Sequence, residues 1–292
     1  MSASPRGLVV AAHGRQYRVE LAPGTTLLCC TRGKRSDVVC GDRVQVEITS
    51  PGRGVITAIE ARRTLLYRSN AAKEKLIAAN VDQIILVVAP QPAFSDALLA
   101  RCLVAAQSQD IAALIVLNKC DLHERLPQAR ARLAGYAALG HPILELSAQH
   151  SAAKLRPWLA GKTSVLVGQS GMGKSTLVNA LIPGARAATR EISTALDSGK
   201  HTTTFAQLYH VEGGGHLIDS PGLQEFGLRH LDLDGLLRAF PEFSPYLGEC
   251  RFRNCQHRQE PGCALQAALA AGKICADRLS LFHELLAEQA AA

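Results

Sequence analysis

The first sixty residues alternate apolar and polar positions in short runs that turn residues separate. Glycine-containing turns such as Pro23-Gly24 and Pro51-Gly52 lie between the runs, which read LVVAA, YRVEL, TTLLC, DRVQVEI and GVITAIE. A period of two places every second side chain on one face of a strand. Short strands at this spacing are typical of a small antiparallel barrel. We therefore predict a small OB-like β-barrel over residues 1–70, with an SH3-like barrel as the alternative.

After residue 70 the pattern changes to continuous apolar runs that alternate with helical stretches. The helical stretches lie around 95–108, 123–138 and 151–160, and the apolar runs are IILVVA (84–89), IAALIVLN (111–118), PILELS (142–147) and SVLVG (164–168). Strands that are apolar on both faces are typical of a parallel sheet that helices cover on both sides. The pattern predicts an α/β domain over residues 71–225.

The last part of the chain favours helices. The runs LDGLLRAF, CALQAALAAG and ADRLSLFHELLAEQAAA have helical composition, and a loop rich in Cys and His interrupts them at residues 250–263. We predict a mostly helical C-terminal domain over residues 226–292.

The composition and the charge of the chain indicate a folded protein with a polyanionic partner. The chain has 292 residues and a net charge of +7, with 47% hydrophobic and 20% charged residues, which excludes a disordered protein. Residues 1–70 hold eleven basic against five acidic residues, whereas residues 226–292 hold seven against eight. The basic barrel therefore indicates a polyanionic partner, although a merely solvated surface has the same charge.

Nothing in the sequence predicts a membrane segment. The longest strongly apolar stretch, Ile84 to Ala89, is far shorter than the roughly 20 residues that cross a bilayer. The N-terminus lacks a long apolar signal core, so the nine cysteines are expected to be reduced thiols and metal ligands rather than disulfides. We expect a cytoplasmic protein.

A phosphate-binding loop follows the apolar run SVLV. Its sequence GQSGMGKS matches G-x-x-x-x-G-K-[ST] and precedes the helical run STLVNALI. Backbone N–H groups of such a loop face phosphates, with Lys174 reaching the β- and γ-phosphates and Ser175 binding Mg²⁺. The predicted phosphate site comprises Gly168, Gln169, Ser170, Gly171, Met172, Gly173, Lys174, Ser175 and Thr176.

Two further segments complete the predicted phosphate and magnesium site. Asp219 follows the apolar run HLI and begins the sequence D-S-P-G, so we expect its carboxylate near Mg²⁺ and the Gly222 N–H near the γ-phosphate. The run Thr202-Thr203-Thr204 lies in a polar segment suited to a switch. Thr203 is the predicted ligand of Mg²⁺ and the γ-phosphate.

Guanine specificity is predicted from two loops that precede the phosphate loop. Asn118-Lys119-Cys120-Asp121 matches N-K-x-D, in which the aspartate accepts from two N–H donors that guanine has and adenine lacks. Ser147-Ala148 resembles the second guanine-side loop. Conventional GTPases place the phosphate loop first, so this order predicts a circularly permuted GTPase domain.

The interrupting loop holds a set of metal ligands. Three thiols and one imidazole within fourteen residues form a full tetrahedral set for one structural Zn²⁺ and leave no open position for substrate. Unrelated buried thiols are the alternative interpretation. The predicted zinc ligands are Cys250, Cys255, His257 and Cys263.

The residue that activates water is not at its usual place. Leu223 follows D-S-P-G, where many GTPases have a glutamine, and an apolar side chain cannot orient water. His201 precedes the threonine run and has two interpretations, a water-positioning catalytic residue or a solvated loop histidine.

Together, the basic barrel, the permuted motifs, the run G-K-H-T-T-T and the C-x4-C-x-H-x5-C loop resemble the ribosome small-subunit-dependent GTPase A family (RsgA, also called YjeQ). The resemblance covers essentially the whole chain. It implies an OB-fold, zinc in the C-terminal domain, and a GTPase that the small ribosomal subunit stimulates and that acts as a checkpoint in late maturation of that subunit. It also implies a role for His201 in hydrolysis.

These observations are compatible with two functions, an enzyme and a binding protein. The first is a GTP hydrolase that small-subunit rRNA gates, and the second is an RNA-binding guanine-nucleotide sensor whose turnover is incidental. A metabolic kinase is disfavoured because N-K-x-D selects guanine. We expect a monomer that binds GTP or GDP, Mg²⁺, one Zn²⁺ and rRNA.

Overall fold

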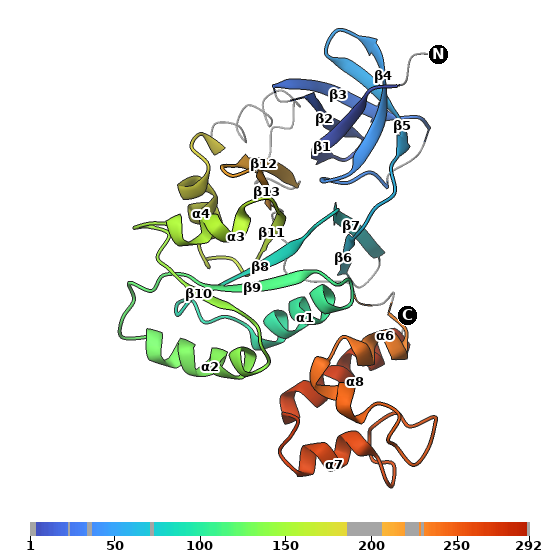
Figure 1. The fold of residues 1–292 in the computed structure, drawn as a ribbon, viewed down its shortest axis with the longest axis vertical. Coiled ribbons are helices and arrows are strands. Elements are labelled where there is room, and N and C mark those ends of the chain that lie inside the picture. The colour runs from blue at the N-terminus through green and yellow to red at the C-terminus, as the bar shows by residue number, and fades with distance from the viewer. Residues whose placement is uncertain are drawn as a thin grey trace.

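The computed structural model describes residues 4–22, 24–33, 37–70, 73–185, 206–219, 228 and 231–290. Three units follow one another along the long axis of the molecule, from a barrel of strands at the N-terminal end through a helix-covered sheet to a bundle of helices (Figure 1). This architecture confirms the predicted fold class. The predicted residues His201, Thr203 and Gly222 lie outside the described residues.

All five apolar runs of the N-terminal unit form strands. The antiparallel pairs β1–β2, β2–β3, β4–β5 and β1–β4, with the parallel pair β3–β5, close the barrel. Alternate side chains such as Val9, Tyr17 and Val44 fill it. The strands are β1 (Arg6–His13), β2 (Gln16–Ala22), β3 (Thr25–Thr31), β4 (Arg43–Ser50) and β5 (Arg53–Ile59).

A hairpin that the sequence patterns do not predict connects the barrel to the rest of the chain. Strand β6 (Leu65–Asn70) pairs antiparallel with β7 (Lys73–Ala79), and an isolated bridge joins Ala78 to Cys40 of the barrel. The boundary expected at residue 70 falls between these two strands.

The central unit is a parallel sheet with one antiparallel strand. Its strand order is β10-β9-β8-β11-β13-β12, and helices lie on both sides of the strands (Figure 1). The strands are β8 (Gln83–Val88), β9 (Ala112–Leu117), β10 (Ile143–Glu145), β11 (Thr163–Val167), β12 (Gln207–Val211) and β13 (Gly215–Asp219). The helices are α1 (Asp96–Gln107), α2 (Leu126–Ala138), the short η1 (Ala153–Leu155) and α3 (Arg156–Leu159), and α4 (Lys174–Leu181).

The strand order fixes where a ligand binds. From β8 the chain moves outward through β9 to β10 and then returns to place β11 on the other side of β8. Such a reversal opens a crevice at the carboxyl ends of the two strands, which is where ligands bind in open α/β sheets. Strand β11 ends immediately before the phosphate loop.

Barrel and central unit share one sheet. Strand β12 pairs antiparallel with β1 through Ala11 and Gln207, and the Ala12 N–H lies 3.4 Å from the Ala206 carbonyl oxygen. The barrel therefore covers the edge strand β12 and extends the sheet to eleven strands.

The C-terminal unit is helical, as predicted. Its centre is an aromatic cluster in which Phe240 and Phe243 stack at 4.8 Å between ring centroids and Phe282 meets both edge-on. Arg101 of α1 joins this unit to the central one through both carboxylate oxygens of Glu288. The helices are α6 (Leu233–Arg238), the short η2 (Pro241–Tyr246), α7 (Ala264–Ala270) and α8 (Ala276–Ala290). Within the described part of the chain, no helix is long and apolar enough to cross a membrane.

Candidate nucleotide and metal sites

The loop from Gly168 to Gly173 leaves β11 and starts α4, and its backbone requires glycine. Gly168, Gly171 and Gly173 have φ of 149°, 81° and 93°. A Cβ on Gly168 would lie 2.3 Å from the Val87 carbonyl oxygen, and one on Gly173 would lie 2.3 Å from Nδ2 of Asn118. The loop is therefore packed against the ends of β8 and β9. Ser170 in the loop and Ser175 and Thr176 in the first turn of α4 are exposed.

Two groups of opposite charge, Lys174 and Asp219, influence each other at this loop. Nζ of Lys174 donates to the Gln169 carbonyl oxygen at 2.8 Å and also to that of Gly168. Burial lowers the pKa of Lys174, whereas the neighbouring Asp219 carboxylate raises it. Burial likewise raises the pKa of Asp219, and Lys174 lowers it. Burial is the larger effect in both cases, so both pKa values shift toward the neutral forms, and the attraction between the carboxylate and the ammonium group offsets only part of each shift.

Asn118 connects the three predicted nucleotide loops. It is almost fully buried at the end of β9. Its Nδ2 donates to the Met172 carbonyl oxygen at 2.9 Å, and its Oδ1 accepts from the Ala148 N–H at 2.9 Å. The side chain holds the N-K-x-D, Ser147-Ala148 and phosphate loops together, so both of its polar atoms are engaged within the protein.

The predicted guanine-recognising carboxylate is fixed by a serine. Ser147 Oγ donates to Oδ1 of Asp121 at 2.5 Å, and this hydrogen bond lowers the pKa of Asp121. The carboxylate is therefore ionised and oriented at neutral pH. The neighbouring Lys119 leaves this loop and donates from Nζ to the Gln91 carbonyl oxygen, in the segment after β8, at 2.9 Å.

The four predicted zinc ligands come together between η2 and α7. The ligand atoms of Cys250, Cys255, His257 and Cys263 all lie within 4.8 Å of one another. Nδ1 of His257 lies 3.5 Å from the sulfur atoms of both Cys250 and Cys263. The N–H groups of His257 and Ala264 point at cysteine sulfur atoms at 3.4 Å. Backbone donors of this kind favour thiolates, so the set fits a closed tetrahedral Zn²⁺ site.

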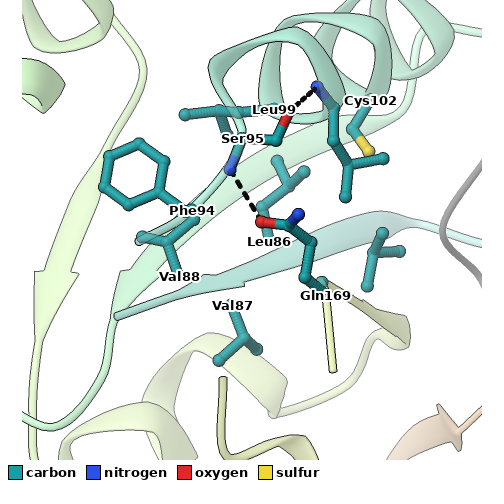
Figure 2. Close-up of a pocket in the computed structure, with 11 residues that line it drawn as sticks. Leu86, Val87, Val88, Phe94, Ser95, Leu99, Cys102 and Gln169 are labelled. Atoms are coloured by element: carbon teal, nitrogen blue, oxygen red, sulfur yellow. Dashed lines mark hydrogen bonds between the residues drawn. The ribbon is translucent and has the colours of Figure 1, made fainter. Parts of the chain in front are cut away.

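The segment after β8 also reaches the phosphate loop, which no sequence motif indicates. A Cβ on Gly171 would lie 3.2 Å from Cγ of Pro92, and the Ser95 N–H donates to Oε1 of Gln169 at 2.7 Å. Figure 2 shows this contact among apolar side chains. The only local signal is the proline-containing run APQPAFS, which predicts a turn and not a function.

Comparisons with known proteins agree with this geometry. Residues 59–229 match the RsgA GTPase family. A protein from Burkholderia pseudomallei (strain K96243) named Small ribosomal subunit biogenesis GTPase RsgA is 55% identical over 288 residues, covering 97% of this chain and 92% of the relative. A protein of the same name from Ralstonia pickettii (strain 12J) is 56% identical over 292 residues, with the same coverage of both.

Solved structures agree over almost the whole chain as well. YjeQ from Thermotoga maritima is similar with a TM-score of 0.74 and 31% identity, covering 99% of each chain. YloQ, described as a circularly permuted GTPase, has a TM-score of 0.69 and 28% identity, covering 99% of this chain and 96% of its own. The predicted permutation of the GTPase domain is confirmed.

Proposed function

The chain belongs to the RsgA GTPase family, and from this premise we propose that it hydrolyses GTP as a checkpoint in late maturation of the small ribosomal subunit. In this proposal the small subunit stimulates hydrolysis. The observation that carries it is the joining of the phosphate loop to both guanine-side loops through Asn118, in a chain 55% identical to a small-subunit biogenesis GTPase.

The phosphates lie, in this proposal, on the backbone N–H groups of residues 168–176, at the N-terminus of α4. Lys174 neutralises the β- and γ-phosphates, and Asp219, Ser175 and Thr203 hold Mg²⁺. When bound, Mg²⁺ would supply positive charge next to the phosphate oxygens during transfer of the γ-phosphoryl group to water. The electrostatic attraction between the Lys174 ammonium group and the Asp219 carboxylate, which come from the phosphate loop and the end of β13, supports these assignments. The Gly222 N–H binds the γ-phosphate.

Hydrolysis also needs an oriented water, and we assign this task to His201. Leu223 follows the D-S-P-G sequence and offers no polar atom for it. An imidazole near neutral pH both donates and accepts, so it can hold water and take up its proton.

The base lies against Asp121, Ser147 and Ala148. An ionised Asp121 accepts from the N1–H and 2-amino groups of guanine, and the low pKa that Ser147 causes supports this role. Asn118 joins the two guanine-side loops, and Lys119 ties the first of them to the segment after β8.

The C-terminal cluster holds one structural Zn²⁺. The ligands Cys250, Cys255, His257 and Cys263 leave no position open, so the ion stabilises the helical unit and takes no part in hydrolysis.

Barrel and zinc loop bind rRNA in this proposal. Arginines are exposed on both, with Arg251, Arg253 and Arg258 beside the zinc ligands and Arg6, Arg15, Arg32, Arg43 and Arg53 on the barrel. Arginine contacts to phosphates give an affinity that decreases steeply with salt. A monomer, a cytoplasmic location and the division into residues 1–70, 71–225 and 226–292 belong to the same proposal.

The GTPase rate tests the proposal when it is measured with small ribosomal subunits, large subunits or bulk RNA. We expect stimulation by small subunits alone, and its loss in His201→Ala with GTP affinity retained. His141→Ala is the matched control. His141 precedes the amino end of β10, whereas the nucleotide loops follow the carboxyl ends of the strands. Tight GTP binding without stimulation by any particle would favour the nucleotide-sensing RNA binder instead.

A further inference from the structure

The side chain of Gln169 turns away from the face of the phosphate loop that binds Lys174. Its Oε1 accepts from the Ser95 N–H at 2.7 Å, as Figure 2 shows. Ser95 is the N-cap of α1, and its Oγ accepts from the Leu98 N–H at 3.2 Å. The phosphate loop is therefore tied through one glutamine to the first turn of a neighbouring helix.

Apolar side chains lie beside this half-buried hydrogen bond. Leu86, Val88, Phe94, Leu99 and Cys102 line the small cavity beside it, and all five are buried. The hydrogen bond itself is half-buried, and breaking it costs free energy because the Ser95 N–H loses its acceptor beside these apolar groups. The position of Gln169 is consequently well defined.

The start of α1 is a rigid anchor even without Gln169. Nη2 of Arg132, on α2, donates at 2.6 Å to both the Phe94 carbonyl oxygen and Oδ2 of Asp96, the two neighbours of Ser95. The Arg132 guanidinium also lies over the Phe94 ring, 4.0 Å from its centroid. Loss of the Gln169 contact would therefore release the phosphate loop and leave the helix in place.

The main chain of Gln169 faces the phosphate site. Its carbonyl oxygen accepts from Nζ of Lys174 at 2.8 Å. Anchoring the side chain therefore also fixes the direction of this carbonyl group and of the N–H groups that follow it in the loop. Pro92 packs against Gly171 and supports the loop at a second point.

We propose that Gln169 is a positioning residue, which holds the phosphate loop against α1 in the shape that binds the diphosphate common to GDP and GTP. This inference rests on the proposed guanine-nucleotide site. A preorganised loop loses less conformational freedom when the ligand binds, so the contact stabilises the bound state of both nucleotides equally.

Gln169→Met tests the proposal, because methionine fills a similar volume and accepts no comparable hydrogen bond. We expect the Kd of GDP and of a non-hydrolysable GTP analogue to rise by the same factor, roughly three- to tenfold. The kcat at saturating GTP should stay unchanged while KM rises. The affinity for guanosine, which has no phosphate, should also stay unchanged.

Ser108→Ala is the matched control. Ser108 Oγ donates to the Ala105 carbonyl oxygen at 2.9 Å at the opposite end of α1, so this variant weakens the same helix away from the phosphate loop. It should bind GDP like the wild type. Gln169→Asn, whose shorter side chain does not reach Ser95, should repeat the effect of Gln169→Met if that variant folds poorly.

Wild-type GDP affinity in both Gln169 variants would overturn the proposal, and so would an equal loss of guanosine and GDP affinity, which indicates general damage. A wild-type protein that binds neither GDP nor GTP would overturn the proposed function itself. The two failures are thus distinguishable within one set of titrations.

Discussion

The carboxamide of Asn118 donates to the Met172 carbonyl oxygen at 2.9 Å and so connects β9 to a phosphate loop that lies fifty-four residues later in the chain. Its oxygen accepts from Ala148. Asn118 belongs to the predicted guanine-recognition motif, but its contacts are with protein groups. We infer that it acts on nucleotide affinity by holding loops in place.

Replacing Asn118 by alanine should weaken GDP and GTP binding. The substitution leaves the Met172 carbonyl oxygen and the Ala148 N–H without partners in a buried place, at a cost of about 1–3 kcal/mol for each group. Because the three loops then lose their connection, nucleotide binding has to order them, and we expect a roughly tenfold loss of affinity, measured by calorimetric titration.

The control for this variant is another bridging asparagine. Asn80 donates to the Gly41 carbonyl oxygen and accepts from the Arg63 N–H, both at 3.0 Å, but it lies at the barrel. Asn80→Ala should lower the melting temperature and keep the GDP affinity. Equal nucleotide affinities of the two variants would contradict the role given to Asn118.

Asp121→Asn should change the preferred base from guanine to xanthine. The carboxylate accepts from the N1–H and 2-amino group of guanine, whereas xanthine has a carbonyl oxygen at position 2 that needs a donor such as the Asn amide. Titrations with GDP and XDP should show weaker GDP binding and tighter XDP binding than in the wild type. If the affinities for GDP and XDP fell by the same factor, Asp121 would hold the loop in place and would not recognise the base.

The sequence patterns predicted the elements whose signal is local. The five barrel runs, the buried strand β8 and the loop Gly168–Gly173 each have a period or a glycine pattern that their own geometry requires. Contacts between distant segments leave no such pattern. The hairpin of β6 and β7, the pairing of β1 with β12 and the anchoring of Gln169 on Ser95 depend on the tertiary fold.

Removal of the predicted zinc should unfold the C-terminal unit. The aromatic cluster around Phe282 is small, and the ring of His257 lies 6.1 Å from that of Phe282, so the metal site supports the same core. Binding energy of a structural zinc ion is folding energy. We expect Cys263→Ser to lose zinc in metal analysis and helical signal in circular dichroism. Cys275→Ser changes an exposed thiol outside the cluster and should retain both. A zinc-free Cys263→Ser variant with wild-type helicity would contradict this prediction.

We expect the stability of the barrel to depend on a buried ion pair between Asp42 and Arg62. Asp42, which is fully buried, accepts from Nε and Nη2 of Arg62 at 2.7 and 2.8 Å and from the Val39 N–H at 2.8 Å. These hydrogen bonds raise the pKa of Arg62, so its guanidinium stays charged. Removing one partner leaves the other charge uncompensated, which costs about 3–5 kcal/mol.

Asp42→Ala should therefore destabilise the barrel selectively. Hydrogen exchange of residues 6–59 should become faster, while exchange in β8 and β9 stays slow because these strands belong to a different core. Glu47→Gln is the control, since Glu47 pairs with Arg32 on the surface, where such a pair contributes about 0–1 kcal/mol. Unchanged exchange in Asp42→Ala would mean that barrel packing alone holds the strands together.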